Sequence, residues 1–276
     1  MNKSSVESAS EQSALLTSLI ESEGVQYGRE DSFKMSHTRL LTQRFLIGVP
    51  TQGITRDRIL RWCDILGMPQ RLRAALTQHL PEANMVGLGL EDGPDHRVYK
   101  VYLEFWDKVR LEVLRTGRPD PMLLHLGFKW LAQSGASDGR IANYTCFPRL
   151  SLHDTLTRIE QIYSDAAART AKDLALGIVR LAAAANPTAS FLYVEAAEEG
   201  NSRRSFDINL YKSERIMGDI EPFLRGLARH YEISEEPFEA LLVRVRFQLL
   251  GHLSGGVDRS GNDATTLYYE TRSMGP

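Results

Sequence analysis

The sequence predicts an α+β protein in which antiparallel β-hairpins alternate with pairs of α-helices. Several segments alternate apolar and polar residues and come in twos, joined by turns that contain glycine, which is the pattern of β-hairpins. Between these segments, apolar residues recur every three or four positions, which is the pattern of amphipathic helices. The order of helix pair and hairpin recurs along the chain, although the sequences of the units are not alike.

The composition is that of a globular protein without a bias toward nucleic acid or membranes. The chain has 276 residues, of which 42% are hydrophobic and 25% charged, and its net charge is -2. Nucleic-acid binding usually needs a strongly basic face, and the charge balance does not indicate one. The first residues lack the pattern of a signal peptide, and the most apolar stretch is shorter than the roughly 20 residues of a membrane span. Cys63 and Cys146 form neither a CxxC pair nor a zinc spacing, so we expect reduced thiols and a cytoplasmic location.

The sequence suggests one domain with a short tail. Residues 1–12 are rich in serine and polar, so we expect a disordered N-terminal tail followed by a single domain over 13–276. Helical periodicity begins near Ser13. The segment Phe33–Pro50 is interpreted as a strand or a strand pair, and the sequence leaves open whether it joins the main sheet.

The later elements are expected in a regular order. They are two helices over 55–67 and 69–81, a hairpin over 84–106, a hairpin over 122–148, two helices between 151 and 187, a hairpin over 188–213, two helices between 214 and 248, and a last hairpin over 249–270. The sequence does not decide whether the residues after Trp106 continue a strand or become helical.

Local signals support these elements. Ile59, Trp62 and Leu66 lie at helical spacing, and Gly67 is expected to end that helix. Ser151 is a suitable N-cap because Asp154 follows three residues later. The first hairpin is expected to turn at residues 92–94, and the second at residues 134–139.

The two faces of the predicted strands differ in a way that favours an enclosed cavity. In the strand Val98–Trp106, Lys100, Tyr102 and Glu104 share one face, and the other face is apolar. A face exposed to solvent would carry more lysine and serine and fewer aromatic residues. The hairpins could form an open antiparallel layer with helices on one face, or a closed barrel ringed by helices. The mixed polar and aromatic faces favour the closed barrel.

The hairpin over 188–213 shows the same mixed faces. Tyr193 and Glu195 share one side of its first half, and Asp207, Asn209 and Tyr211 share one side of its second half. Because unpaired carboxylates in a dry core are costly, we expect these side chains to line the same cavity. Aromatic rows also stabilise sheets without any ligand, so packing alone is the competing explanation.

These units, together with strands such as RVYKVYLEF and SFDINLY, resemble the ABBA-fold aromatic prenyltransferases. Members of that family are closed antiparallel barrels ringed by helices, and they move an isoprenoid from an allylic diphosphate to an aromatic small molecule. The resemblance covers about residues 55–270, and its nearest local match is YKVY at Tyr99–Tyr102.

The resemblance implies roles for particular residues. Lys100 and Tyr102 would contact the diphosphate, and Lys129, Tyr211 and Tyr268 are further candidates by face and position. Glu104 or Glu195 would act as the general base. The glycine-rich stretch 254–263 is best explained as a wide turn, but it also offers an anion site closed by Arg259.

The carboxylates expected in the cavity are a departure from that family. Glu104, Glu195, Asp207 and Glu270 would repel a diphosphate unless Mg²⁺ intervened, and no DDxxD cluster is present to hold the ion. His125 and His252 would form a metal site with Glu104 or Asp207 only if all face one interior, and hydrogen-bonded histidines are the commoner case. The alternative function is therefore a non-catalytic small-molecule-binding or pathway accessory protein with the same cavity. Basic residues that converge on one point would favour the transferase, and carboxylates that pair with them would favour the binding protein.

Overall fold

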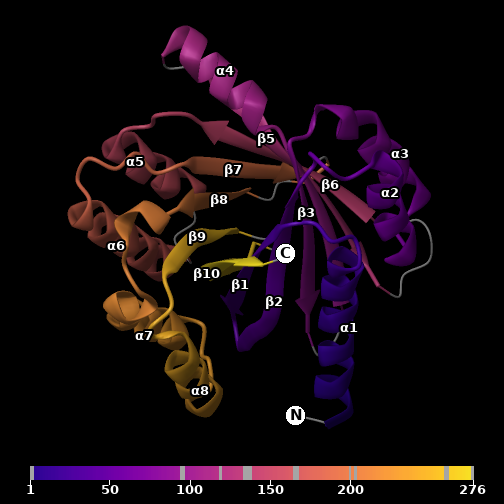
Figure 1. Cartoon of the computed structure of the whole chain (residues 1–276). Helices are drawn as coiled ribbons and strands as arrows, with labels where there is room; N and C mark the ends of the chain where they lie inside the picture. The colour runs from indigo at the N-terminus through magenta and orange to yellow at the C-terminus, as the bar shows by residue number, and fades with distance from the viewer. Residues whose placement is uncertain are drawn as a thin grey trace.

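The computed structural model describes residues 3–93, 97–117, 120–132, 139–163, 168–198, 200–201, 204–257 and 261–274. These residues form ten strands and eight α-helices, and the helices lie outside the sheet (Figure 1). The strands are β1 (Tyr27–Ser36), β2 (Arg39–Pro50), β3 (Met85–Asp92), β4 (Arg97–Glu104), β5 (Met122–Leu131), β6 (Gly139–Phe147), β7 (Tyr193–Glu198), β8 (Arg204–Asn209), β9 (Leu250–Val257) and β10 (Asp263–Met274). The helices are α1 (Lys3–Glu21), α2 (Arg56–Ile65), α3 (Gln70–His79), α4 (Trp106–Thr116), α5 (Leu152–Ile162), α6 (Arg169–Ala185), α7 (Glu221–His230) and α8 (Glu235–Val245).

The sheet closes into a barrel, which confirms the predicted fold class. Its order is β1-β10-β9-β8-β7-β6-β5-β4-β3-β2, and each neighbouring pair is antiparallel. Closure is made by the first and last strands, where Phe33 of β1 lies opposite Leu267 of β10. The segment Phe33–Pro50 therefore does contribute to a strand pair in the barrel, which the sequence had left open.

The core lies between the barrel and its helices. On β4, Tyr99, Val101 and Leu103 are buried on the outer face, against the cluster that contains Trp62 of α2 and Leu72 of α3. A second cluster fills the space between α5–α8 and strands β7–β10. Because strand side chains alternate, the other face of each strand points into the barrel.

The predicted helix signals hold at α2 and α5. Gly67 has a φ of 69°, a left-handed conformation that glycine adopts without strain just after the end of α2. The Oγ atom of Ser151 accepts a hydrogen bond of 3.0 Å from the backbone N–H of Asp154 and so caps α5.

Helix α1 differs from the expected pattern, and helix α4 settles a point that the sequence left open. α1 begins at Lys3 rather than near Ser13, and its Leu16 and Ile20 are fully buried against the barrel wall. The division into a tail over 1–12 and a domain over 13–276 stays a prediction. α4 resolves the ambiguity after β4, because the chain turns helical at Trp106.

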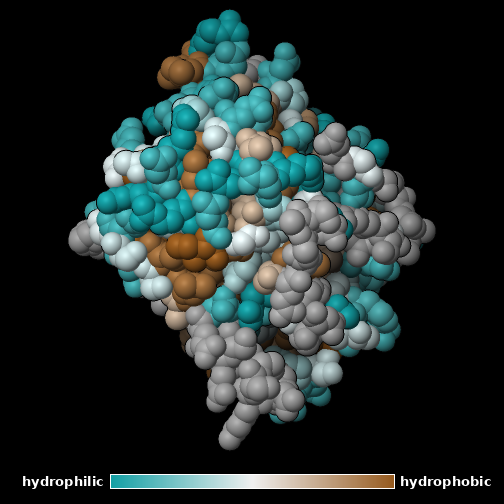
Figure 2. Space-filling view, turned by 90° about the vertical axis from the view of Figure 1, so that its right-hand side faces the viewer, coloured by the Kyte–Doolittle hydropathy of each residue, from teal (hydrophilic) through white to brown (hydrophobic). Residues whose placement is uncertain are grey.

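α4 projects from the barrel at the end opposite the hairpin turns (Figure 1). Val109 of α4 packs there with Leu124, Cys146 and Val194 in a small apolar cluster. The outer side of the helix exposes Leu111 and Leu114, and hydrophobic atoms are visible where it projects at the top of Figure 2. None of the helices in the described part of the chain has the length and apolar character needed to cross a membrane.

Candidate active site

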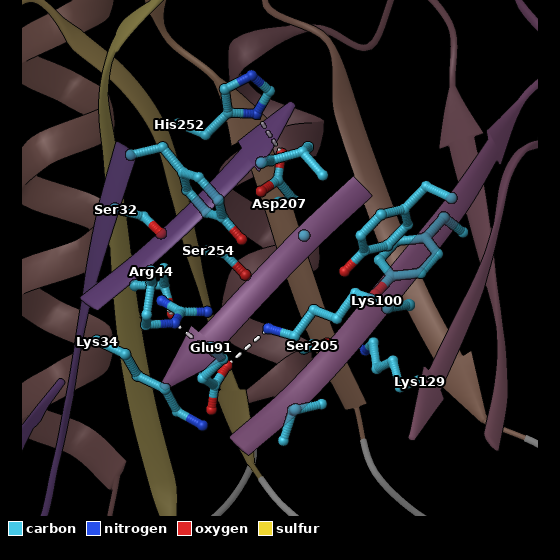
Figure 3. Close-up of a pocket in the computed structure, with 18 of the residues that line it drawn as sticks. Ser32, Lys34, Arg44, Glu91, Lys100, Lys129, Ser205, Asp207, His252 and Ser254 are labelled. Atoms are coloured by element: carbon cyan, nitrogen blue, oxygen red, sulfur yellow. Dashed lines mark hydrogen bonds and ion pairs between the residues drawn. The ribbon is translucent and has the colours of Figure 1, made fainter. Parts of the chain in front are cut away.

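The barrel encloses a cavity of about 720 Å³ that is lined by residues from all ten strands. Its charged residues divide into two groups. One group lies toward the hairpin turns, and the other lies toward α4, with tyrosines between them. Figure 3 shows this separation, with His252 and Asp207 at the upper end and Lys34, Glu91 and Lys129 at the lower end.

The end near the hairpin turns is basic. Among the described residues, five cations line this part of the cavity against two carboxylates, Glu91 and Glu198; the cations are Lys34, Arg44, Lys100, Lys129 and Arg140. Arg44 Nε and Lys100 Nζ both contact Oε2 of Glu91, at 3.1 Å and 2.6 Å. Lys129 Nζ lies 3.9 Å from Glu198. The excess of positive charge makes this end suitable for a polyanion.

Burial and neighbouring charges shift the pKa values of Glu91 and Lys100 at the basic end. Desolvation opposes the charge on Glu91, but Lys100 and Arg44 overcome it and hold the pKa of Glu91 well below its usual range. Desolvation, partly offset by Glu91, lowers the pKa of Lys100 to about 7. The charge of Lys100 therefore changes near neutral pH.

Tyrosines form the middle of the cavity. Tyr102 and Tyr144 meet edge to face with ring centroids 5.7 Å apart, and Tyr268 lies edge to face with His252 at 5.7 Å. Burial raises the pKa of Tyr102 well above 10 and also raises that of Tyr268, so both hydroxyls stay protonated and can donate hydrogen bonds. Their ring faces carry partial negative charge that attracts cations.

Gly127 of β5 makes room for the tyrosine pair. A Cβ atom at this position would lie 2.9 Å from Cε1 of Tyr102 and 2.9 Å from Cε2 of Tyr144. We expect Gly127→Ala to lower the free energy of unfolding by about 1–3 kcal/mol, because the rings must move in a packed wall. Gly48→Ala is the matched control, since its Cβ would meet only Met85 Cε at 3.4 Å. Urea unfolding of both variants checks this, and equal stabilities would contradict it.

The end near α4 is acidic. Glu30, Glu104 and Asp207 line it together with His125 and His252. Asp207 Oδ1 lies 2.6 Å from His252 Nδ1, and Glu30 Oε1 lies 3.8 Å from His252 Nε2. Burial by itself would lower the pKa of His252, but Asp207 and Glu30 raise it to about 9. His252 is therefore an imidazolium at neutral pH.

Glu104, His125 and Glu30 complete the acidic end. Oε2 of Glu104 accepts a hydrogen bond of 2.6 Å from Trp106 Nε1 and lies 3.8 Å from His125 Nε2. Burial lowers the pKa of His125, so this ring is neutral near pH 7. Burial raises the pKa of Glu30 above its usual value, although His252 and the Tyr211 hydroxyl oppose that shift.

Most of the residues predicted from the sequence do meet in this cavity. Its lining includes Lys100, Tyr102, Glu104, Lys129, Asp207 and Tyr268. Asn209 Nδ2 lies 3.1 Å from His252 Nε2. Tyr211 belongs to a 3-10 turn over Tyr211–Ser213 rather than to a strand, and its hydroxyl donates a hydrogen bond of 2.6 Å to Glu30. Arg259 lies outside the described residues, as does the side chain of Glu270.

The predicted positions of Tyr193 and Glu195 are wrong. Both side chains point outward toward the helices, and Val194, Ala196 and Glu198 are the residues of β7 that line the cavity. Tyr193 is fully buried in the core, where its ring stacks on Phe206 with centroids 6.3 Å apart. Glu195 pairs with Arg158 of α5 at 2.7 Å. The guanidinium of Arg158 offsets the energetic cost of placing the Glu195 carboxylate on the outer face. A carboxylate in this strand therefore did not identify the face that points into the barrel.

Sequence reasoning missed Arg44, Glu91 and Glu30. Arg44 is only 7% exposed, and it directly precedes the apolar run Phe45–Val49. An arginine that adjoins an apolar run within a strand was the signal that could have identified it, because such a charge needs a partner when it is buried. Its partner Glu91 sits on the neighbouring strand, directly opposite in the register.

The described histidines and carboxylates of the acidic end are not arranged as a set of metal ligands. Within the described ranges, no group of three or more His, Cys, Asp or Glu side chains is placed to hold a metal ion. His252 instead forms an ion pair with Asp207.

Comparisons with solved structures identify the fold. The chain is similar to 5-dimethylallyltryptophan synthase from Streptomyces coelicolor, with a TM-score of 0.55 and 14% identity over 88% of this chain and 80% of that chain. It is also similar to NotF prenyltransferase (TM-score 0.51, 9% identity, 88% and 80% covered) and to AnaPT from Neosartorya fischeri (TM-score 0.50, 11% identity, 88% and 77% covered). No family model and no curated protein sequence matches the chain. The closed ten-stranded barrel ringed by helices is thus the ABBA fold of aromatic prenyltransferases.

Proposed function

We propose that this protein is a transferase that moves an isoprenoid from an allylic diphosphate to an aromatic small molecule inside the barrel. The single observation that carries the proposal is the charge layout of the cavity. Five cations gather at one end, tyrosines follow, and carboxylates that can accept a proton lie at the other end. Transfer of an allylic group needs a cationic site for the diphosphate, an aromatic site for the allylic cation and a proton acceptor beside the aromatic substrate, in this order along the cavity.

The basic end would bind the diphosphate. Arg44 offers a planar guanidinium for phosphate oxygens, and Lys100 and Lys129 supply point charges on the adjoining strands. As the C–O bond breaks, the leaving diphosphate keeps the electron pair, and these cations stabilise the developing charge. The allylic cation would lie against Tyr102, Tyr144 and Tyr268, whose ring faces attract it and whose bulk excludes water.

The acidic end would complete the reaction. The aromatic acceptor donates a pair of electrons to the allylic cation, and a proton must then leave the acceptor. Glu30 is the better proton acceptor, because burial raises its pKa toward the working pH and Tyr211 holds its carboxylate in place. Glu104, which the sequence had indicated, lies in the same region and is the second candidate.

The structural relatives support this assignment. The Streptomyces enzyme is named for the prenylation of tryptophan, and one of its structures holds DMASPP and Trp. A structure of NotF holds brevianamide F and DMSPP. A barrel of this shape therefore accommodates a diphosphate analogue together with an aromatic molecule in proteins other than this one.

One observation favours the non-catalytic alternative. Glu91 contacts both Arg44 and Lys100, and Glu198 lies near Lys129, so the cations are in part neutralised by the protein itself. A carrier of a small amphiphilic ligand would tolerate such pairing. The transferase needs a diphosphate to compete with Glu91 for its two partners.

A binding experiment separates the two functions. We expect dimethylallyl or geranyl diphosphate to stabilise the protein by roughly 2.7 kcal/mol at a hundred times the dissociation constant. The shift in melting temperature is measured with and without Mg²⁺, which also shows whether the ion takes part. Turnover is then followed as release of diphosphate in the presence of an indole acceptor. A protein that binds neither diphosphate under either condition is not a prenyltransferase.

A further inference from the structure

The acidic end of the cavity has an excess of negative charge, and none of the described residues that line it is a lysine or an arginine. Among the described lining residues, it holds three carboxylates, Glu30, Glu104 and Asp207, and one cation, the imidazolium of His252. All the lysines and arginines of that lining lie at the basic end. A charged group buried without a counter-charge is costly, so this arrangement favours a ligand that brings positive charge with it.

Glu104 is the carboxylate best placed to receive that charge. Glu30 and Asp207 share His252 between them, at 3.8 Å and 2.6 Å. Among the described residues, Glu104 contacts the neutral donor of Trp106 and lies near the neutral ring of His125, while the His252 imidazolium acts on it only from farther away. The side chain of Glu104 is 16% exposed, so bulk water does little to screen it.

His125 provides a second and independent indication of a ligand. Its Nε2 atom is screened from solvent and has no hydrogen-bond partner in the described part of the chain. Buried polar atoms are nearly always paired in native structures, and an exception calls for an explanation. When the ring proton is on Nδ1, Nε2 is an acceptor 3.8 Å from the carboxylate oxygen of Glu104.

Two acceptors this close match a primary ammonium group. An ammonium has three N–H donors, so it can bind the Glu104 carboxylate and also donate to His125 Nε2 once a small side-chain shift admits it, whereas a hydroxyl has one donor. The aromatic ring of Tyr144 flanks His125 with centroids 6.0 Å apart and adds a ring face that attracts a cation. A carboxylate on the ligand would instead face three carboxylates of the same sign.

We propose that the aromatic acceptor carries a cationic amine, which Glu104 and His125 bind at the acidic end of the barrel. This inference rests on the proposed function, because it concerns the second substrate of that reaction. It places the amine on the side of the cavity away from the diphosphate, so the charges of the two substrates match the two ends of the cavity.

Matched pairs of aromatic ligands test the proposal. Tryptamine is compared with tryptophol, and tyramine with tyrosol, by calorimetric titration of the full chain at pH 7, alone and with DMASPP present. In each pair only the ammonium is exchanged for a hydroxyl. We expect each amine to bind about tenfold more tightly than its alcohol or better.

One variant tests whether Glu104 causes the preference for the amine over the alcohol. Glu104→Gln keeps an acceptor for the Trp106 N–H but removes the charge, so the preference for the amine is expected to fall to about twofold or less. Glu160→Gln, at an exposed position on α5, is the control and should retain it. Alcohols that bind as tightly as amines on both ring systems, or an unchanged preference in Glu104→Gln, would overturn the inference. Failure of DMASPP to bind would count against the transferase instead, since the amine titration without it is a separate measurement.

Discussion

Replacing Glu30 by Gln is expected to lower kcat by about 10²–10⁴-fold and to leave the KM for dimethylallyl diphosphate nearly unchanged. The amide can still accept the hydrogen bond from Tyr211, so the side chain keeps its place. It cannot take a proton from the acceptor. In the proposed function the diphosphate binds at the opposite end of the cavity, beside Arg44 and Lys100, so the change should not affect it. Steady-state kinetics with dimethylallyl diphosphate and tryptophan or tryptamine measure both constants.

Glu104→Gln is the variant with which Glu30→Gln is compared. If Glu104 binds the amine of the acceptor, its loss raises the KM for tryptamine more than it lowers kcat. A large fall in kcat in Glu104→Gln with an active Glu30→Gln would show that the two roles are exchanged. Two active variants would mean that neither carboxylate accepts the proton.

Strand β4 shows what the sequence could predict about the site. Its outer face is apolar without a break, so Lys100, Tyr102 and Glu104 could only face inward once the sheet closed. Strand β7 lacks this contrast, because its inner residues Val194 and Ala196 are themselves apolar. Alternation of residue types shows which side chains share a face of a strand, but it does not show which face points into the barrel. For this reason Tyr193 and Glu195 were assigned to the inner face, which is wrong.

The remaining part of the site depends on contacts between distant segments. Glu30 meets His252 and Tyr211 only because β1 pairs with β10 and closes the barrel. Arg44 meets Glu91 across β2 and β3, which are separated in sequence by two helices. Local periodicity contains no information on these pairings, so the fold class was predictable while half of the charged cavity was not.

The affinity for a diphosphate is expected to fall about tenfold between pH 6.5 and pH 8.5 because of Lys100. Burial lowers the pKa of this amine to about 7, so the side chain is mostly charged at the lower pH and mostly neutral at the higher one. A diphosphate attracts the charged form, and its binding is therefore coupled to the uptake of a proton. Titration calorimetry with DMASPP across this pH range measures the effect.

Two substitutions at the same position provide the controls. The Lys100→Arg variant stays charged across this pH range, so its affinity for DMASPP should be high and should change little with pH. Any remaining dependence of the affinity on pH comes from the ligand or from His252, whose pKa is about 9. Lys100→Met should bind weakly at pH 6.5, roughly tenfold or more below the parent protein, with the same flat profile. Its melting temperature is measured alongside, since Glu91 then loses its ion pair with Lys100 and keeps the one with Arg44. A folded Lys100→Met variant with the affinity and slope of the parent would exclude Lys100 from the diphosphate site.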